Sequence, residues 1–590
     1  MLFNSTCETL VDVLTYRGQN NATKNACIFL GKGDSADEIT YEKLADKAKL
    51  IALYLKENGL KKGDRALLIF VPGLELTTAF FGCLYAGVIA VPVYPPINPK
   101  LLEKTKRVVK NSTPNIILST EESIIKFATG DDEENFAQTS NKQRYFEKLP
   151  CLATDKLLPA TLENWQQPAL NRDDIAFLQY TSGSTMHPKG VMVNHGNLLD
   201  NLAKIYRSFG LHADTIFFSW LPPYHDMGLI GNLLTPIYGG LSLVQMTPFS
   251  FLQNPVSWLK NIQKYKATFS GAPNFAYDYC VKRIKEEKKE GLDLSSWQLA
   301  FNGAEPIKAE TMERFYQAFK NYGFKKEAFY PCYGLAEATL LATGGPLGVN
   351  YRTVRVAKEH FQENKVHFVE EGEQGYTLVS SGQTIQTIKI VDPDTLIECG
   401  KDTVGEIWIN GPSVAAGYWQ QPEETELAFK GKIADDPSNV DYLRTGDLGF
   451  IHDDELYVTG RIKDLIILYG KNHYPQDIEY TLHHCAFHHL LGDCAAFVMT
   501  VENDYRLTVM CEVKNRYLEK AEQEYLFNSI FETVYQQHEL EIHTIVLIPS
   551  KTIPKTTSGK IRRNFCRQHL GNNTIPVIAT WQLMLDEKKP

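Results

Sequence analysis

The sequence predicts a multi-domain α/β protein, and three observations lead to this. A chain of 590 residues is too long for one hydrophobic core, so two or more domains are expected. Short apolar runs alternate with helical patterns in the N-terminal half, which indicates a parallel sheet. From about residue 376 strand-like segments separated by turns replace that alternation, and a compact α+β pattern follows Gly460.

The first β-α-β unit is predicted at residues 66–94. Residues 66–71 form a short apolar strand between turn pairs. The stretch 76–99 carries no charge, which could suggest a membrane span, but it is interrupted by Gly82, Gly87, Pro92, Pro95 and Pro96. It therefore fits a buried helix at 74–85 followed by a buried strand at 88–94, and no transmembrane segment is expected.

These patterns divide the chain into two predicted domains. The N-terminal domain covers residues 1–462, with two similar α/β lobes at about 1–170 and 171–375 and a β-rich subdomain at about 376–462. Residues 121–172 are polar and are expected to connect the lobes irregularly. A small α+β domain at 463–590 follows, with the boundary near Lys463.

The composition limits the partners and the compartment. A net charge of −9 and a pI of about 6.0 disfavour nucleic acid, because no basic excess is available for a phosphate backbone. Eleven cysteines without a C-x-x-C pair suit a reducing compartment. The N-terminus lacks a secretory signal pattern, so a cytoplasmic location is expected.

Residues 180–190 have the composition of a phosphate-binding turn between two strands. Small and hydroxyl residues allow close backbone approach and donate hydrogen bonds, and a lysine adds positive charge. The stretch does not match the Walker A pattern, and taken alone it is more often a plain loop. The candidate phosphate ligands are Thr181, Ser182, Gly183, Ser184, Thr185 and Lys189.

Five further clusters carry chemically suitable residues. Residues 301–306 could offer backbone groups to a flat ring, and 333–339 combine an aromatic ring with a carboxylate suited to Mg²⁺. Asp447 could accept both ribose hydroxyls, and Arg461 suits a ribose or phosphate contact at a linker. Lys560 lies on a Gly-containing loop, from which one lysine can stabilise developing negative charge. Each cluster also has an ordinary interpretation, as a turn, a helix start, a solvated linker or a basic tail.

Together, in this order, the six clusters resemble the adenylate-forming superfamily of acyl ligases and luciferases, over about residues 10–570. The resemblance implies a large domain that binds ATP and a carboxylic acid, and a small mobile lid that swings about a hinge at Lys463. It implies that Lys560, His225 and Lys189 act in catalysis, and that Glu337, with Thr185 as a second candidate, holds Mg²⁺. The implied nucleotide contacts, besides the phosphate turn, are Gly303, Ala304, Glu305, Tyr333, Gly334, Asp447 and Arg461. Met186 stands where the family usually has glycine, which is expected to change loop flexibility but not chemistry.

Other features suggest the branch of the superfamily. His225 would lie beside the α-phosphate, and the apolar, glycine-bearing stretches 230–240 and 271–277 could line an alkyl channel with Ile230, Gly231 and Phe275, or simply pack in the core. Residues 469–479 are similar to the corresponding segment of fatty acyl-AMP ligases. An extra polar segment at about 350–375 also resembles an insertion of these enzymes, or it is a surface insertion without function. Arg562, Arg563 and Arg567 could meet an acidic carrier or be ordinary surface charge.

The resemblance therefore implies a fatty acyl-AMP ligase. A fatty acid would react with ATP to give acyl-AMP and pyrophosphate, and the acyl group would pass to the phosphopantetheine thiol of an acyl carrier protein. Two alternatives stay open. One is a fatty acyl-CoA synthetase, and the other is a catalytically inactive acid-binding protein on the same fold.

Overall fold

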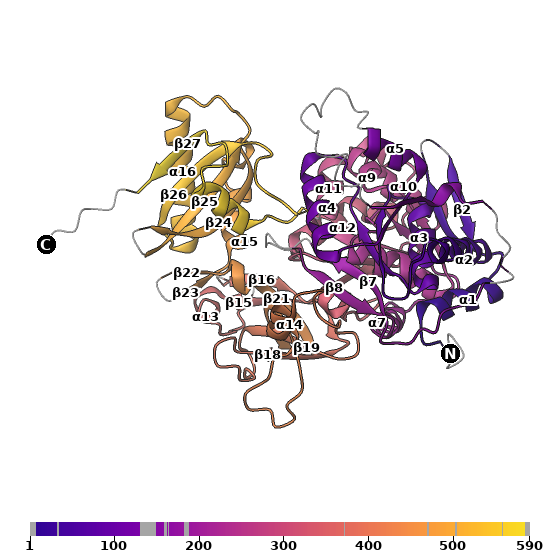
Figure 1. Ribbon diagram of the computed structural model, residues 1–590. Coiled ribbons are helices and arrows are strands. Elements are labelled where there is room, and N and C mark those ends of the chain that lie inside the picture. The colour runs from indigo at the N-terminus through magenta and orange to yellow at the C-terminus, as the bar shows by residue number, and fades with distance from the viewer. Residues whose placement is uncertain are drawn as a thin grey trace.

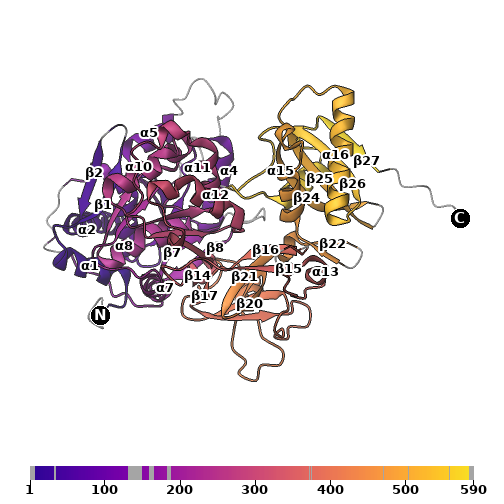
Figure 2. The same cartoon turned by 180° about the vertical axis from the view of Figure 1, so that it is seen from behind.

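A computed structural model describes residues 7–31, 33, 35–129, 149–158, 162, 165–181, 188–370, 372–373, 375–468, 471–501, 504–556 and 559–583. The polypeptide forms a large body, a β-rich part beside it and a smaller C-terminal domain. Figure 1 shows the C-terminal domain in yellow next to the large indigo-to-magenta body, with the orange β-rich part below both. The view from behind shows the same arrangement (Figure 2).

The first α/β layer is a six-stranded sheet in the order β6-β5-β3-β4-β7-β8. The predicted unit at 66–94 is present as β3, α3 and β4. Helix α3 has no charged residue after its first turn because both of its sides are buried. The elements are β3 (Arg65–Ile69), α3 (Leu74–Ala86), β4 (Ile89–Val93), α4 (Pro99–Ser112), β5 (Ile116–Ser119), α5 (Glu121–Thr129), β6 (Cys151–Ala153), β7 (Ile175–Tyr180) and β8 (Gly190–Asn194).

The second layer is a 13-stranded sheet that continues into the β-rich part. Its α/β portion contains β1 (Asn25–Leu30), β2 (Ala36–Thr40), β9 (Ile216–Ser219), β10 (Ser242–Gln245), β11 (Phe269–Pro273), β12 (Leu299–Gly303), β13 (Phe329–Gly334) and β14 (Leu341–Gly344). The antiparallel portion contains β17 (Gln383–Thr384), β18 (Thr387–Val391), β19 (Gly405–Asn410), β20 (Leu443–His452) and β21 (Glu455–Arg461).

The remaining helices of the large body are α1 (Leu10–Asn20), α2 (Tyr41–Glu57), α7 (His195–Ser208), α8 (Thr235–Gly239), α9 (Pro248–Gln253), α10 (Val256–Tyr265), α11 (Asn274–Arg283) and α12 (Ala309–Phe319), and α14 (Pro422–Phe429) lies in the β-rich part (Figure 1). One continuous hydrophobic core joins them to both sheets. Among the described residues no helix is long and apolar enough to cross a membrane.

The two lobes do not divide at residue 170 as the sequence predicted. Strand β1 pairs in parallel with β10, so the N-terminal hairpin belongs to the second sheet. Strand β7 pairs with β4, so β7 and β8 complete the first sheet. The predicted boundary between the lobes is wrong because β1 and β2 pair with the second sheet, whereas β7 and β8 pair with the first. Pairing between strands so far apart in the sequence cannot be recognised from local patterns. The segment 121–172 was also expected to be irregular, yet it contains α5 and β6.

The C-terminal domain has a core of its own, which includes Ile478, Val509 and Ile545. Its four-stranded sheet has the order β24-β25-β26-β27, and a two-stranded sheet, β22-β23, precedes it. The elements are β22 (Ile466–Leu468), β23 (Lys471–His473), α15 (Pro475–His484), β24 (Leu491–Val501), β25 (Asp504–Val513), α16 (Lys520–His538), β26 (Ile542–Pro549), α17 (Arg563–Gly571) and β27 (Ala579–Gln582). Separate cores support a boundary near Lys463, which we retain as a proposal.

The extra segment at 350–375 is folded rather than a loose loop. It forms β15 (Thr353–Ala357) and α13 (Lys358–Phe361), and β15 pairs with β16 (Gly375–Val379). Phe361 is buried against Tyr474 of the C-terminal domain, with ring centroids 5.3 Å apart. This segment therefore packs between the β-rich part and the C-terminal domain.

Candidate active site

The phosphate-binding turn connects β7 to β8. The two ends of the turn are joined by a hydrogen bond of 3.3 Å from the Thr181 amide to the Lys189 carbonyl. Ser182, Gly183, Ser184, Thr185 and Met186 lie outside the described residues, so their contribution stays a prediction. The Lys189 ammonium lies 4.4 Å from the ring centroid of Tyr418. Burial and the nearby Lys463 lower the pKa of Lys189, while Glu337 acts in the opposite direction.

The turn after β12 and the strand β13 form the predicted adenine region. Gly303 ends β12, and Ala304 follows with a φ of +66°, a left-handed conformation that is uncommon outside glycine and often marks functional sites. The Glu305 carboxylate accepts a hydrogen bond of 2.5 Å from the Phe275 amide, and burial raises its pKa. Gly334 has no room for a side chain, since a Cβ there would lie 1.8 Å from the Leu340 carbonyl oxygen.

Asp447 joins two of the other predicted nucleotide contacts. Its Oδ1 accepts a hydrogen bond of 2.7 Å from Arg461 Nε, and its Oδ2 accepts one of 2.8 Å from the Tyr333 hydroxyl. Adjacent antiparallel strands hold this arrangement, because Asp447 of β20 pairs directly with Arg461 of β21. Each carboxylate oxygen retains a second lone pair, so Asp447 can still accept two ribose hydroxyls.

Glu337 is held by a residue that sequence reasoning missed. The Tyr418 hydroxyl donates a hydrogen bond of 2.8 Å to Glu337 Oε1. Within the described part of the chain no side chain donates a hydrogen bond to Oε2, and burial raises the pKa of this carboxyl group. Among the described residues no group of three acidic, His or Cys side chains could form a metal cage. One carboxylate supplemented by phosphate oxygens fits Mg²⁺, which usually binds in that way.

His225 and Asp226 lie where β9 leads into a π-helix, Met227–Leu234. His225 Nδ1 lies 2.5 Å from Asp226 Oδ1. Burial acts to raise the pKa of Asp226, but His225, the Met227 amide and Lys560 lower it below the usual range. π-Helical turns are rare and occur often at functional sites.

The three candidate channel residues lie on two neighbouring elements. Ile230 and Gly231 are buried in the π-helix, and Gly231 faces the Leu340 side chain. Phe275, at the start of α11, is half-buried with its ring edge-on to Trp220, at 6.4 Å between centroids. Their role in a channel stays a prediction.

Lys560 reaches this site from the C-terminal domain. Its loop is closed by a hydrogen bond of 2.7 Å from the Thr556 amide to the Lys560 carbonyl. Burial and Arg461 lower the pKa of Lys560, whereas Glu305, Asp447 and Asp226 raise it. The charges of Glu305, Asp447 and Asp226, which belong to the predicted adenine, ribose and acid contacts, therefore act on Lys560.

Two contacts of the C-terminal domain could not be read from the sequence. Lys308, next to the adenine turn, places its ammonium 4.4 Å from the ring centroid of Tyr480 on α15. Arg563 was expected as a carrier contact or ordinary surface charge, and the second interpretation is wrong. Its side chain is only 15% exposed and is engaged by Asp464 and Glu479. The sequence contains one indication that Arg563 belongs to the site, because it follows Lys560 within the same motif.

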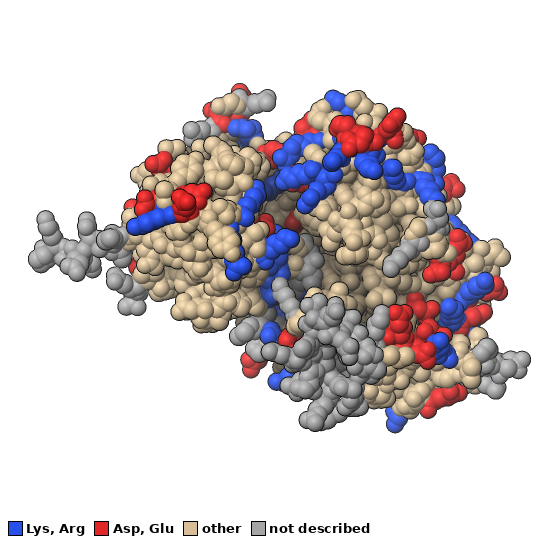
Figure 3. All heavy atoms as spheres, turned by 90° about the horizontal axis from the view of Figure 1, so that it is seen from above, with Lys and Arg blue, Asp and Glu red and all other residues tan. Residues whose placement is uncertain are grey.

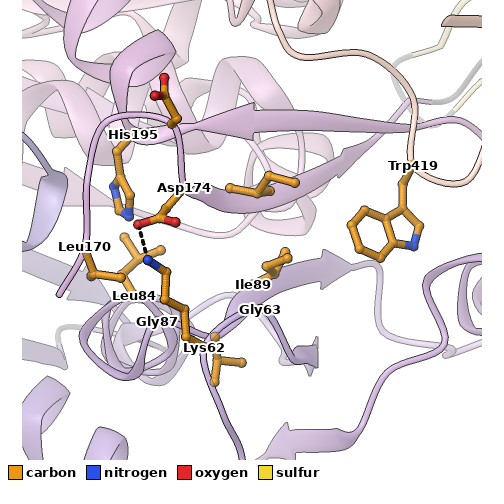
Figure 4. A pocket seen from close by; sticks show the side chains of 12 residues that line it. Lys62, Gly63, Leu84, Gly87, Ile89, Leu170, Asp174, His195 and Trp419 are labelled. Carbon is orange, nitrogen blue, oxygen red and sulfur yellow. Dashed lines mark ion pairs between the residues drawn. The ribbon is translucent and has the colours of Figure 1, made fainter. Parts of the chain in front are cut away.

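Thr181, Phe275 and Gly303 lie at or just after the carboxyl ends of β7, β11 and β12, where open α/β sheets bind ligands. In Figure 3 Lys and Arg side chains gather along both walls of the groove between the large body and the C-terminal domain, which suits a polyphosphate. A separate pocket lies before β3, β4 and β7, at the opposite ends of the strands (Figure 4). An ion pair of 2.7 Å between Lys62 and Asp174 lies in it, and none of the predicted site residues lines it.

Comparison with known proteins agrees with this fold. The family model described as "AMP-binding enzyme" matches residues 14–419, and one described as "Disco-interacting protein 2-like, AMP domain" matches residues 463–580. The chain is 40% identical, over 95% of its length and 94% of the relative's, to the medium-chain-fatty-acid–[acyl-carrier-protein] ligase JamA of Moorena producens. It is 61% identical to the fatty acid AMP ligase from Legionella pneumophila, whose crystal structure matches with a TM-score of 0.75 over 98% of each chain.

A second structure from L. pneumophila, a fatty acyl-adenylate ligase in complex with acyl adenylate and pyrophosphate, is 60% identical, with a TM-score of 0.75 over 98% of each chain. The fold is thus that of an adenylate-forming enzyme, as predicted. The chain belongs to the AMP-binding enzyme family, and the predicted resemblance to its fatty acyl-AMP ligases is confirmed.

Proposed function

We propose that this enzyme activates a fatty acid with ATP to give fatty acyl-AMP and pyrophosphate, and then passes the acyl group to the phosphopantetheine thiol of an acyl carrier protein. One observation carries the proposal. In this member of the family Lys560, on a loop of the C-terminal domain, is close enough to Arg461, Glu305, Asp447 and Asp226 for their charges to act on its ammonium group. The same reaction is supported by the relatives, of which one is an acyl-carrier-protein ligase and another is bound to acyl adenylate and pyrophosphate.

The first step joins two anions, and the site is built to offset their repulsion. The fatty carboxylate attacks the α-phosphorus of ATP, a new P–O bond forms, and the bond to pyrophosphate breaks. Lys560 bridges the carboxylate and the α-phosphate, so its positive charge is placed where negative charge concentrates. Lys189 and the hydroxyl-rich turn hold the leaving pyrophosphate, and Lys463 adds to the positive field there.

The nucleotide is oriented by the adenine turn and by Asp447. Gly303, Ala304 and Glu305 border the adenine together with Tyr333, and Asp447 accepts the ribose hydroxyls while Arg461 fixes its carboxylate. His225, held by Asp226, lies beside the incoming carboxylate. The alkyl chain extends toward Ile230, Gly231 and Phe275.

Glu337 would hold Mg²⁺, with Thr185 as a second ligand. When bound, the metal neutralises charge on the phosphate oxygens. Tyr418 orients the Glu337 carboxylate toward this task, since its hydroxyl occupies only one of the two oxygens.

Transfer to a carrier protein rather than to free CoA is supported by contacts of the extra segment. The Asn472 amide donates a hydrogen bond of 3.0 Å to the Gln362 carbonyl, and Lys358 Nζ donates to the Gln537 carbonyl of α16. Together with the Phe361–Tyr474 contact, these bonds tie the segment to the C-terminal domain. A lid restrained about its hinge at Lys463 keeps the acyl-AMP shielded from water until the carrier thiol arrives.

We place the enzyme in the cytoplasm. All eleven cysteines are free thiols, including Cys494 and Cys511, which lie opposite each other on β24 and β25 without forming a disulfide. Free thiols throughout a long chain suit a reducing compartment.

Product analysis by mass spectrometry tests the function. The enzyme is supplied with ATP, Mg²⁺ and a panel of fatty acids, alone, with CoA, and with a phosphopantetheinylated carrier. We expect acyl-AMP alone and acyl-carrier as the dominant thioester. Acyl-CoA as the dominant product would instead establish a fatty acyl-CoA synthetase, and no acyl-AMP in any condition would indicate an inactive acid-binding protein.

A further inference from the structure

We propose that Arg563 is a positioning residue for Lys560, which fixes the base of the Lys560 loop to the segment where the chain leaves the large domain. The inference rests on the proposed function, because it takes Lys560 as the catalytic lysine.

The contacts of Arg563 are numerous and directional. Its Nε and Nη2 donate hydrogen bonds of 2.7 Å to the two carboxylate oxygens of Glu479 on α15, and its Nη1 donates one of 2.9 Å to Asp464 Oδ2. Glu479 Oε1 also accepts a hydrogen bond of 3.1 Å from the Ala496 amide on β24. A planar guanidinium can hold two carboxylates at fixed angles, which a lysine ammonium cannot reproduce.

These contacts lie at the base of the catalytic loop. Residues 555 and 561 form an isolated antiparallel bridge, and the Arg562 amide donates a hydrogen bond of 2.8 Å to the Pro554 carbonyl. Lys560 therefore projects from a small closed loop whose stem ends at Arg563, the first residue of α17. Any rotation of this stem would move Lys560 relative to the carboxylates that it faces.

The other end of the connection is the hinge segment. Asp464 directly follows Lys463, which is close enough to Lys189 to lower the pKa of that lysine. Arg563 thus links the stem of the Lys560 loop to the chain segment beside the phosphate-binding lysine. The setting of the hinge and the position of Lys560 are coupled through one side chain, although 99 residues separate Asp464 from Arg563.

A double-mutant cycle with Lys560 separates positioning from a merely structural role. The rate of acyl-AMP formation is measured in a single turnover for the wild type, Arg563→Lys, Lys560→Ala and the double variant. Arg563→Lys should reduce the rate about tenfold or more, because misplacement of a catalytic group by about 1 Å can cost 100-fold, and should leave KM for ATP unchanged. In the Lys560→Ala background the same substitution should have no further effect.

The control is Arg567→Lys, the same substitution at an exposed position one turn further along α17, which should leave the rate unchanged. An equal reduction by Arg563→Lys in both backgrounds, or no reduction in the wild type, would overturn the inference. Should Arg563→Lys fail to fold, as judged by thermal unfolding, Asp464→Asn takes its place in the cycle with the same expectations. A Lys560→Ala variant with an undiminished rate would instead refute the proposed catalytic lysine itself.

Discussion

The hydroxyl of Tyr418 donates a hydrogen bond of 2.8 Å to Glu337, and the face of the same ring lies 4.4 Å from the Lys189 ammonium. One side chain therefore contacts both the predicted metal ligand and the predicted phosphate-binding lysine. The position of Tyr418 is itself fixed, because the flanking chain pairs with β8 through the Met192 and Trp419 amides.

Tyr418→Phe should weaken the binding of Mg²⁺ specifically. The phenyl ring remains beneath Lys189, but Glu337 loses a hydrogen bond to a charged group, worth about 1.5–3 kcal/mol. We expect the Mg²⁺ concentration for half-maximal acyl-AMP formation to rise about tenfold, with little change in KM for ATP at saturating metal. Tyr418→Leu also removes the cation–π contact, worth about 0.5–2 kcal/mol, and should raise KM for ATP as well. Identical Mg²⁺ titrations for the wild type and Tyr418→Phe would contradict this account.

Asp447→Ala should raise KM for ATP by at least about 100-fold, because it removes the ribose acceptor and leaves the Arg461 guanidinium without its partner. Tyr333→Phe removes only the hydroxyl that donates to Asp447 and keeps the ring beside the adenine, so an increase of a few-fold is expected. Steady-state kinetics with varied ATP measure both. Equal effects of the two substitutions would mean that Asp447 does not contact the nucleotide directly.

Asp477 should make stability depend on pH. Burial, with Glu479 nearby, raises its pKa to about 7, although Lys308, Lys358 and Arg563 oppose the shift. A carboxyl group whose folded pKa is raised contributes stability below its unfolded pKa, near 4, and loses that contribution as the pH rises to about 7. Asp477→Asn lacks this loss. At pH 8 its free energy of unfolding should therefore exceed that of the wild type by about 1–3 kcal/mol, seen as a higher unfolding temperature, and at pH 4 no such gain is expected. A gain of equal size at both pH values would exclude titration of Asp477 as the cause.

Phe361→Ala should loosen the extra segment from the C-terminal domain. The substitution removes the contact with Tyr474 and costs about 3–5 kcal/mol of packing. If this contact restrains the lid, the acyl-CoA yield with free CoA should rise while the rate of acyl-AMP formation is retained. Glu363→Ala, at an exposed position of the same segment, serves as the control and should leave the acyl-CoA yield unchanged. An unchanged product ratio for Phe361→Ala would mean that the contact does not govern the choice of thiol.

Most of the fold could be predicted because its signals are local. The apolar runs that became β3 and β4 are bounded by turn residues, and helix α3, which carries no charge after its first turn, is buried on both sides. The exchange of β1 and β7 between the lobes could not be predicted, since register between distant strands depends on tertiary packing.

The same division holds for the site. Lys189, Asp447, Arg461 and Lys560 lie within recognisable motifs, whereas Tyr418 and Asp464 act through contacts with residues about 80 to 100 positions away. A single sequence contains no trace of such pairs. Arg563 was a candidate residue, but its burial between two carboxylates could not be predicted, because charged side chains are usually exposed.

Transfer of an isotope tests the central claim most directly. A fatty acid labelled with ¹⁸O at both carboxylate oxygens is incubated with the enzyme, ATP, Mg²⁺ and a phosphopantetheinylated carrier, and the released AMP is analysed by mass spectrometry. Attack of the carboxylate on the α-phosphorus, followed by thiol attack on the carbonyl carbon, leaves one carboxylate oxygen on AMP. The account predicts AMP carrying one ¹⁸O atom for each acyl group transferred. Acyl-carrier formed together with unlabelled AMP would contradict it.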